Sequence, residues 1–123
     1  MLDLLLNADV YAPAPLGRRH LLIGGGTILY VGEERPEVSG PDVRVTDLGG
    51  WRLLPGFIDG HAHLTGGGGE AGPQTKVPPV PLSAFTSAGV TTAVGVLGTD
   101  DLTRTTSELI TQVRALRAEG LSA

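Results

Sequence analysis

Residues 55–64 read Pro-Gly-Phe-Ile-Asp-Gly-His-Ala-His-Leu, and this stretch decides the fold that the rest of the chain is expected to adopt. Its apolar residues predict a strand over residues 57–64 that ends on two histidines, His61 and His63. Because side chains alternate between the two faces of a strand, both imidazoles are expected on one face, about 7 Å apart at the backbone. Two such rings can lean onto one metal ion at roughly 2.0–2.1 Å from each nitrogen. The pattern therefore favours metal ligands, with a solvated or hydrogen-bonded strand end as the alternative.

A glycine run at residues 66–69 follows this strand and leads directly into Glu70. Glycine lets backbone N–H and C=O groups approach a ligand closely, which favours substrate contact through Gly68 and Gly69. The Glu70 carboxylate offers a negative charge suited to an ammonium group. The alternatives are a flexible linker for the glycines and a surface carboxylate for Glu70.

The residues after the glycine run predict alternating helices and strands. A short helix is expected over residues 82–88, a second strand over 91–97, and a longer amphipathic helix over 107–119. Consecutive parallel strands need such helical crossovers, so this order predicts the opening of a parallel α/β sheet. Thr99 follows the second strand and is predicted to contact substrate, with a turn or capping hydroxyl as the alternative.

Two neighbouring features of this region complete its prediction. Asp100 and Asp101 are expected to serve the turn and the start of the next helix rather than catalysis. A third strand is expected to begin near residues 121–123, where the chain ends. Two βα units are roughly a quarter of a (β/α)₈ barrel of about 250 residues. The sequence is therefore expected to be the front part of a longer enzyme.

The first half of the chain has a different character. Short apolar runs separated by turn residues predict a small antiparallel β module, with a hairpin that joins residues 20–23 to 27–31 through three glycines. The expected domains are therefore residues 1–54, which form strands, and residues 55–123, which form βα units. Trp51 and Phe57 are expected in the core.

Composition excludes several classes of function. The formal net charge of −4 and an aromatic content of 4% disfavour a nucleic-acid binder, which needs basic residues and stacking surfaces. The chain has no cysteine, so a thiolate zinc site and a disulfide framework are excluded. No apolar stretch approaches the ~20 residues that a membrane span needs. A cytoplasmic protein without a membrane partner is expected.

The motifs together resemble a known family. The run from Leu54 to His63 is similar to the first barrel strand of the amidohydrolase superfamily. The residues His-Ala-His-Leu-Thr-Gly-Gly-Gly-Gly-Glu at 61–70, with Leu-Gly-Thr-Asp at 97–100, more specifically resemble the isoaspartyl dipeptidase family. The resemblance implies an α/β fold: the N-terminal part of a small β-sandwich, followed by the first two βα units of an incomplete (β/α)₈ barrel.

The resemblance also implies an activity and roles for named residues. It implies a zinc-dependent dipeptidase that hydrolyses β-aspartyl dipeptides with a metal-activated hydroxide at a binuclear zinc centre. His61 and His63 would bind the first metal, Gly68, Gly69 and Glu70 would bind the substrate's ammonium end, and Thr99 would contact its aspartyl head group. No catalytic residue is expected within the chain, because the remaining ligands and the acid/base aspartate would lie beyond Ala123. A homo-oligomer is expected for the full-length enzyme.

Two alternatives stay open at this point. One is another enzyme of the same superfamily, of the dihydroorotase or deacetylase type, whose substrate does not need a carboxylate at Glu70. The other is a non-catalytic piece, either a truncated remnant or a segment that pairs with a complementary chain. Residues 1–123 alone are expected to be inactive.

Overall fold

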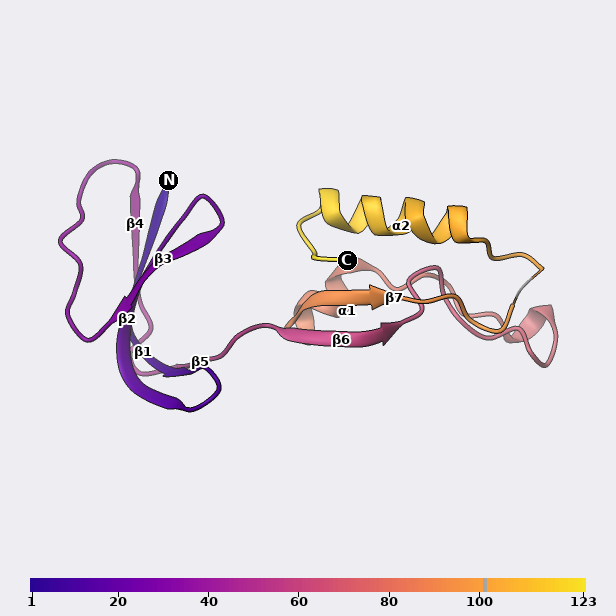
Figure 1. The fold of residues 1–123 in the computed structure, drawn as a ribbon, viewed down its shortest axis with the longest axis horizontal. Coiled ribbons are helices and arrows are strands. Elements are labelled where there is room, and N and C mark those ends of the chain that lie inside the picture. The colour runs from indigo at the N-terminus through magenta and orange to yellow at the C-terminus, as the bar shows by residue number, and fades with distance from the viewer. Residues whose placement is uncertain (101) are drawn as a thin grey trace. The chain divides into compact units, whose positions relative to one another are not determined.

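The structure is a computed structural model, and it describes residues 1–100 and 102–123. The chain divides into two compact units, Met1–Pro55 and Gly56–Ala123. Their elements are labelled in Figure 1. The first unit contains strands only and the second combines strands with helices, so the α/β class is confirmed.

The first unit is one mixed sheet in the order β3-β2-β1-β4, with β5 also paired to β1. Its strands are β1 (Leu2–Tyr11), β2 (Pro15–Gly24), β3 (Thr27–Gly32), β4 (Val43–Asp47) and β5 (Arg52–Leu53). β2 and β3 form the predicted antiparallel hairpin. The prediction of a wholly antiparallel module is wrong, because β4 and β5 pair with β1 in parallel. Hydrophobic alternation predicts which face of a strand is buried, but it does not encode the direction of its partner.

A bulge in β1 interrupts its register with β2 near Asn7. Asn7 has φ of +56°, in the left-handed region, and the register with β2 shifts between Leu5 and Ala8. Asn tolerates this conformation better than most residues. The Asn7 backbone N–H donates to His20 Nδ1 at 3.2 Å, and its side-chain amide donates to Asp47 at 2.9 Å. The first of these contacts gives His20 a hydrogen-bonding role within the sheet.

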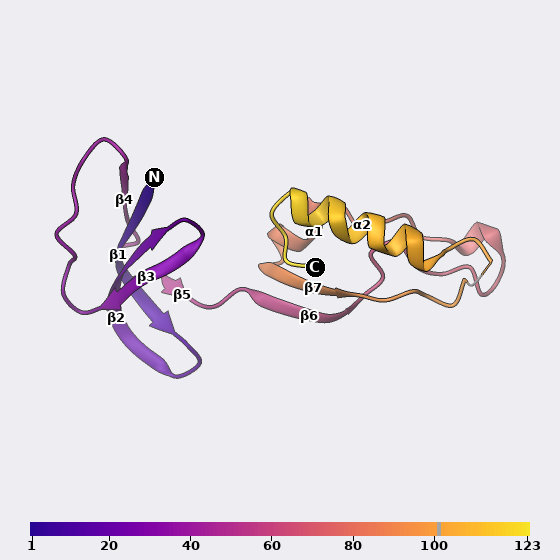
Figure 2. The same ribbon diagram turned by 45° about the horizontal axis from the view of Figure 1, so that its top comes forward.

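The second unit contains the parallel pair that the sequence predicts. β6 (Phe57–Ala62) pairs in parallel with β7 (Val90–Gly95), and α1 (Leu82–Ser87) lies between them in the chain. A 3₁₀ turn, η1 (Pro73–Thr75), precedes α1, and α2 (Thr106–Ala118) follows β7. Figures 1 and 2 both show β6 and β7 side by side with α2 running along them. Since parallel strands end at a common edge, the loops after β6 and β7 begin next to each other.

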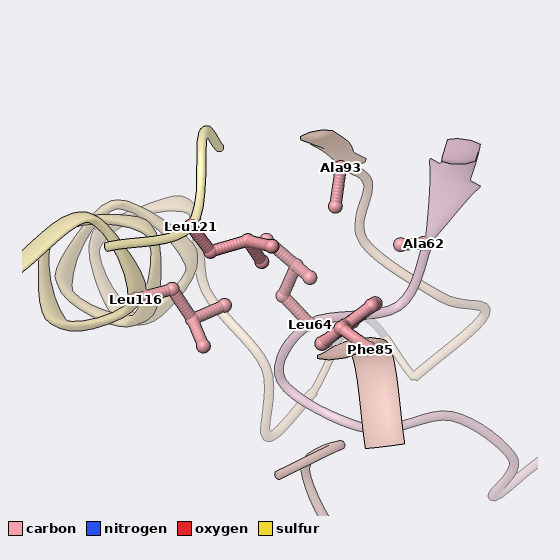
Figure 3. Packing of buried hydrophobic residues seen from close by; sticks show 6 residues of the cluster. All are labelled: Ala62, Leu64, Phe85, Ala93, Leu116 and Leu121. Atoms are coloured by element: carbon pink, nitrogen blue, oxygen red, sulfur yellow. The ribbon is translucent and has the colours of Figure 1, made fainter. Parts of the chain in front are cut away.

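One hydrophobic core joins these strands and helices. Small residues, Ala62 and Ala93, come from the strands. Larger buried side chains pack on them from the loop after β6, from both helices and from the segment after α2: Leu64, Phe85, Leu116 and Leu121. Figure 3 shows Leu64 between Phe85 and Leu121. Beyond α2, the Ser122 backbone pairs with β7 in parallel through a bridge to Thr92, where the sequence predicts a third strand to begin.

Two sequence predictions about the core are wrong. Trp51 is 78% exposed and Phe57 is 59% exposed. Their aromatic character predicts a preference for burial, but it does not determine which element covers them. The prediction that Asp100 serves a turn is confirmed, because its carboxylate accepts the Thr103 backbone N–H at 3.0 Å. The same prediction for Asp101 lies outside the described residues.

Candidate metal and substrate site

His61 and His63 lie where the chain leaves β6. The strand ends at Ala62, two residues earlier than predicted, because a turn closes with a hydrogen bond from Gly66 N–H to the His63 carbonyl at 2.8 Å. Ala62 stays paired to the neighbouring strand, since its carbonyl accepts the Val96 N–H at 2.9 Å. The Asp59 carboxylate accepts the His61 backbone N–H at 3.0 Å. Asp59 therefore orders the backbone that carries the first imidazole.

The two imidazole rings are close together. Their centroids lie 5.2 Å apart, and the ring planes meet at 84°. His61 is exposed and His63 is half-buried, with Nδ1 of His63 buried and lacking a hydrogen-bond partner among the described residues. A buried polar nitrogen without a partner loses free energy that a bound ion or water would restore. The pair thus fits part of a metal site.

Two histidines are an incomplete ligand set. Among the described residues, no group of three or more His, Cys, Asp or Glu side chains could hold a metal ion together. Catalytic zinc normally has three protein ligands and a water. The described part of the chain can therefore supply two donors to such an ion and no more.

A cavity of about 440 Å³ opens beside the two histidines. Its lining includes Asp59, His61, His63 and the first two glycines of the run, with Phe85 from α1. Gly68, Gly69, Glu70 and Thr99 do not line it. A larger cavity of about 720 Å³ lies between β7 and α2, but its lining residues include no histidine and no carboxylate side chain, so it lies away from this chemistry.

The glycine run is held in place by its neighbours. Gly68 has φ of +71°, and a Cβ at this position would lie 2.3 Å from the Thr75 carbonyl oxygen. The Gly67 carbonyl accepts the Val77 N–H at 2.9 Å, and Gly69 donates to Thr75 Oγ1 at 3.1 Å. A flexible linker would lack such contacts. These residues form a folded loop in which only glycine fits at Gly68.

Glu70 and Thr99 come together although they lie 29 positions apart in the chain. The Thr99 hydroxyl donates a hydrogen bond to Glu70 Oε1. This hydrogen bond holds the pKa of Glu70 below its ordinary value, assisted by a backbone hydrogen bond and by the nearby charge of His63. Both side chains are exposed. The site therefore presents a carboxylate that stays ionised at neutral pH.

Lys76 and Arg104 are not among the site residues that the sequence predicts. Lys76 Nζ lies 2.6 Å from Asp100 Oδ2, and Arg104 Nε lies 3.7 Å from the same oxygen. The hydrogen bonds from Lys76 and Thr103 strongly lower the pKa of Asp100. One sequence signal could have indicated this cluster: Asp100 and Arg104 are spaced i,i+4 just before a predicted helix. Its link to Lys76 joins distant parts of the chain and carries no local signature.

Comparison with known proteins supports the resemblance found in the sequence. No family model matches the chain. The chain is 35% identical over 125 residues to an imidazolonepropionase of Salinispora arenicola, covering 97% of this chain and 29% of that protein. It is 45% identical over 56 residues to a dihydroorotase of Bacillus caldolyticus, covering 46% of this chain and 13% of that protein.

A solved structure of higher coverage is the beta-aspartyl dipeptidase of Fervidobacterium islandicum AW-1. It is 38% identical, with a TM-score of 0.92 over 99% of this chain and 33% of that one. Its complex with β-Asp-Leu dipeptide gives a TM-score of 0.91 at the same identity. The chain spans a third or less of the length of each of these relatives. Over almost its whole length the chain is similar to about one third of a beta-aspartyl dipeptidase, and the curated relatives that it resembles are members of the amidohydrolase superfamily.

Proposed function

We propose that this chain forms the N-terminal part of a zinc-dependent dipeptidase that hydrolyses β-aspartyl dipeptides. The first unit would contribute to a small β-sandwich, and β6, α1, β7 and α2 would form the first two βα units of a (β/α)₈ barrel. One observation carries the proposal: the paired imidazoles of His61 and His63 share one edge of the β6–β7 sheet with the hydrogen-bonded Glu70 and Thr99. Barrel enzymes carry their chemistry at this end of the strands.

His61 and His63 would hold zinc through their imidazole nitrogens. When bound, zinc lowers the pKa of a water molecule towards ~7 and polarises a carbonyl group. Asp59 would keep the first imidazole in place through the His61 backbone. The second metal of a binuclear centre and the acid/base group would need residues other than these.

Glu70 would select the substrate's free ammonium group. Its lowered pKa keeps the carboxylate charged at neutral pH, where an ammonium group is also charged. The Thr99 hydroxyl donates its hydrogen to Glu70, so its oxygen lone pairs stay able to accept a hydrogen bond from the same ammonium. A β-aspartyl dipeptide carries such an ammonium next to the aspartyl carboxylate.

The test compares two substrates. It uses the longer natural enzyme of which, in this proposal, residues 1–123 are the N-terminal part. We expect hydrolysis of β-Asp-Leu and at least tenfold weaker turnover of dihydroorotate. A hydrogen bond to a charged group contributes about 1.5–3 kcal/mol, so Glu70→Gln should lower kcat/KM for β-Asp-Leu by roughly ten- to a hundredfold. Exchange of the exposed Glu119, Glu119→Gln, is the matched control.

A dihydroorotase-type enzyme is the second candidate, favoured by the similarity to the Bacillus caldolyticus protein. Turnover of dihydroorotate that exceeds turnover of β-Asp-Leu and is insensitive to Glu70→Gln would support it and reject the dipeptidase. A polypeptide limited to residues 1–123 is expected to hydrolyse neither substrate and to bind zinc substoichiometrically, because its described residues supply two imidazole ligands. Turnover by purified 123-residue material of verified mass would contradict that expectation.

A further inference from the structure

One arginine joins the loops that follow β6 and β7. Arg104, in the second loop, donates from Nη2 to the Val77 carbonyl at 3.1 Å and to the Gly67 carbonyl at 3.3 Å. These two carbonyls belong to opposite arms of the first loop, and Arg104 is only 9% exposed. A single buried guanidinium therefore connects both sides of the loop after β6, which contains residues 66–77 and is called the glycine loop below, to the loop after β7.

The absence of a side chain at Gly66 leaves the space that the Arg104 guanidinium occupies. A Cβ on Gly66 would lie 2.7 Å from Arg104 Nη1 and 2.1 Å from the Val77 carbonyl oxygen. Both distances are too short for a real side chain, so the backbone at Gly66 must be bare for the arginine to lie against it. The positive φ of +90° at Gly66 independently favours glycine.

The charge of Arg104 is balanced by Asp100 beside it. The Asp100 side chain is 8% exposed, and its Oδ2 lies 3.7 Å from Arg104 Nε and 2.6 Å from Lys76 Nζ. Lys76 belongs to the first loop, so this pair is a second tie between the two loops. A buried charge is tolerated when it is paired and hydrogen-bonded, as Asp100 is here.

Both sets of contacts involve residues close to Glu70 in the chain or bonded to it. Asp100 follows Thr99 in the chain, and the Thr99 hydroxyl donates to Glu70. Gly67, which accepts from Arg104, lies three residues before Glu70 on the other side. Glu70 is thus connected to Arg104 and Asp100 in two ways: its carboxylate accepts from Thr99, the neighbour of Asp100, and its backbone continues from the Gly67 segment that Arg104 contacts.

We propose that Arg104 is a positioning residue that fixes Glu70 against Thr99 for recognition of the substrate's ammonium group. This inference rests on the proposed function. Arg104 acts through the Gly67 carbonyl and through Asp100, and it is not itself a catalytic residue. Its loss should therefore weaken ammonium binding more than the chemical step.

The experiment is a double-mutant cycle on the natural polypeptide, with β-Asp-Leu as substrate. We expect Arg104→Met to raise KM about tenfold with kcat changed less than twofold. In a Glu70→Gln background the same exchange should change KM less than twofold, because the group that it positions is gone. Arg104→Lys, which retains the charge, should restore part of the affinity, and the exposed Arg114→Met on α2 is the matched control.

Two results would overturn the positioning role: a fall in kcat with KM unchanged, or an effect of Arg104→Met that is equally large with and without Glu70. If the unmodified protein does not hydrolyse β-Asp-Leu, the proposed function fails by itself. Amide hydrogen exchange then tests the contact between Arg104 and the glycine loop by itself. Arg104→Met should accelerate exchange over residues 66–77 and leave exchange in α2 unchanged. If that variant does not fold, Arg104→Lys is measured in its place. Unchanged exchange in the loop would reject that contact.

Discussion

The Thr99 hydroxyl donates a hydrogen bond to the Glu70 carboxylate and thereby connects the loops after β6 and β7. We expect Thr99→Val to raise the pKa of Glu70 towards its ordinary 4.5, because the largest cause of its lowering is removed. Thr99→Ser keeps the hydroxyl and should keep the pKa low. An NMR titration of the Glu70 carboxyl carbon measures both. Equal pKa values in the valine and serine variants would show that the hydroxyl does not hold this carboxylate.

Zinc binding should depend on both histidines of the pair. His61→Gln and His63→Gln should each weaken zinc binding by at least about tenfold, because each removes one of two nitrogen donors. Zinc content of the natural polypeptide after dialysis against a dilute zinc buffer measures the effect. His20→Gln, in the β2 strand, should retain the zinc content of the unmodified protein. Full zinc content in both pair variants would contradict the metal assignment.

Replacement of Gly68 by alanine should destabilise the glycine loop. Gly68 and Gly120 both have positive φ, which costs a residue with a Cβ roughly 1–2 kcal/mol. A Cβ at Gly68 also meets the Thr75 carbonyl at 2.3 Å, whereas at Gly120 it meets nothing within 4 Å. Gly68→Ala should therefore lower the free energy of unfolding by about 1–3 kcal/mol more than Gly120→Ala. Urea unfolding followed by ellipticity at 222 nm makes the comparison, and equal losses would contradict it.

Leu64 should be one of the most sensitive positions in the core of the second unit. It is fully buried between the strands and helices, so Leu64→Ala should cost about 2–5 kcal/mol in the free energy of unfolding. The control is Leu102→Ala, since Leu102 is 90% exposed and should change stability by less than about 0.5 kcal/mol. The same urea titrations measure both. A small effect at Leu64 would mean that the core described around it does not form in solution.

Asp100 should make the stability of the second unit depend on acid pH. Its folded-state pKa is lowered, so its carboxylate contributes stability that is fully present above about 3.8, the unfolded value, and is lost as the pH falls through the folded pKa. The difference in unfolding free energy between the unmodified protein and Asp100→Asn should be largest at pH 5–7 and shrink below pH 3.8. Unfolding at pH 7, 5 and 3 tests this, with the exposed Asp42→Asn as control. A difference that grows towards pH 3 would have the wrong sign.

Much of the second unit could be predicted from local sequence patterns. The order of strands and helices after Pro55, the parallel pairing of β6 with β7, and the closeness of His61 to His63 all follow from hydrophobic periodicity and from the alternation of side chains along a strand. Glu70 and Thr99 were each predicted as substrate contacts, but the hydrogen bond between them was not. It depends on how two loops pack, and neither loop has a periodic pattern.

Other features required information that local patterns do not contain. The parallel pairing of β4 and β5 with β1 depends on long connections, and the Arg104–Asp100–Lys76 cluster depends on contacts between distant residues. The roles assigned to Gly68, Gly69, Glu70 and Thr99, a cytoplasmic location and a homo-oligomer stay predictions. Among the described helices, none is both long and apolar enough to cross a membrane.

The division into two units has a spectroscopic consequence. The single tryptophan, Trp51, and both tyrosines, Tyr11 and Tyr30, lie in Met1–Pro55, whereas α1 and α2 lie in Gly56–Ala123. Intrinsic fluorescence excited at the tryptophan band therefore reports on the first unit, and helical ellipticity reports on the second. Recording both signals in one titration would reveal directly whether the two halves lose their structure in a single cooperative step or independently.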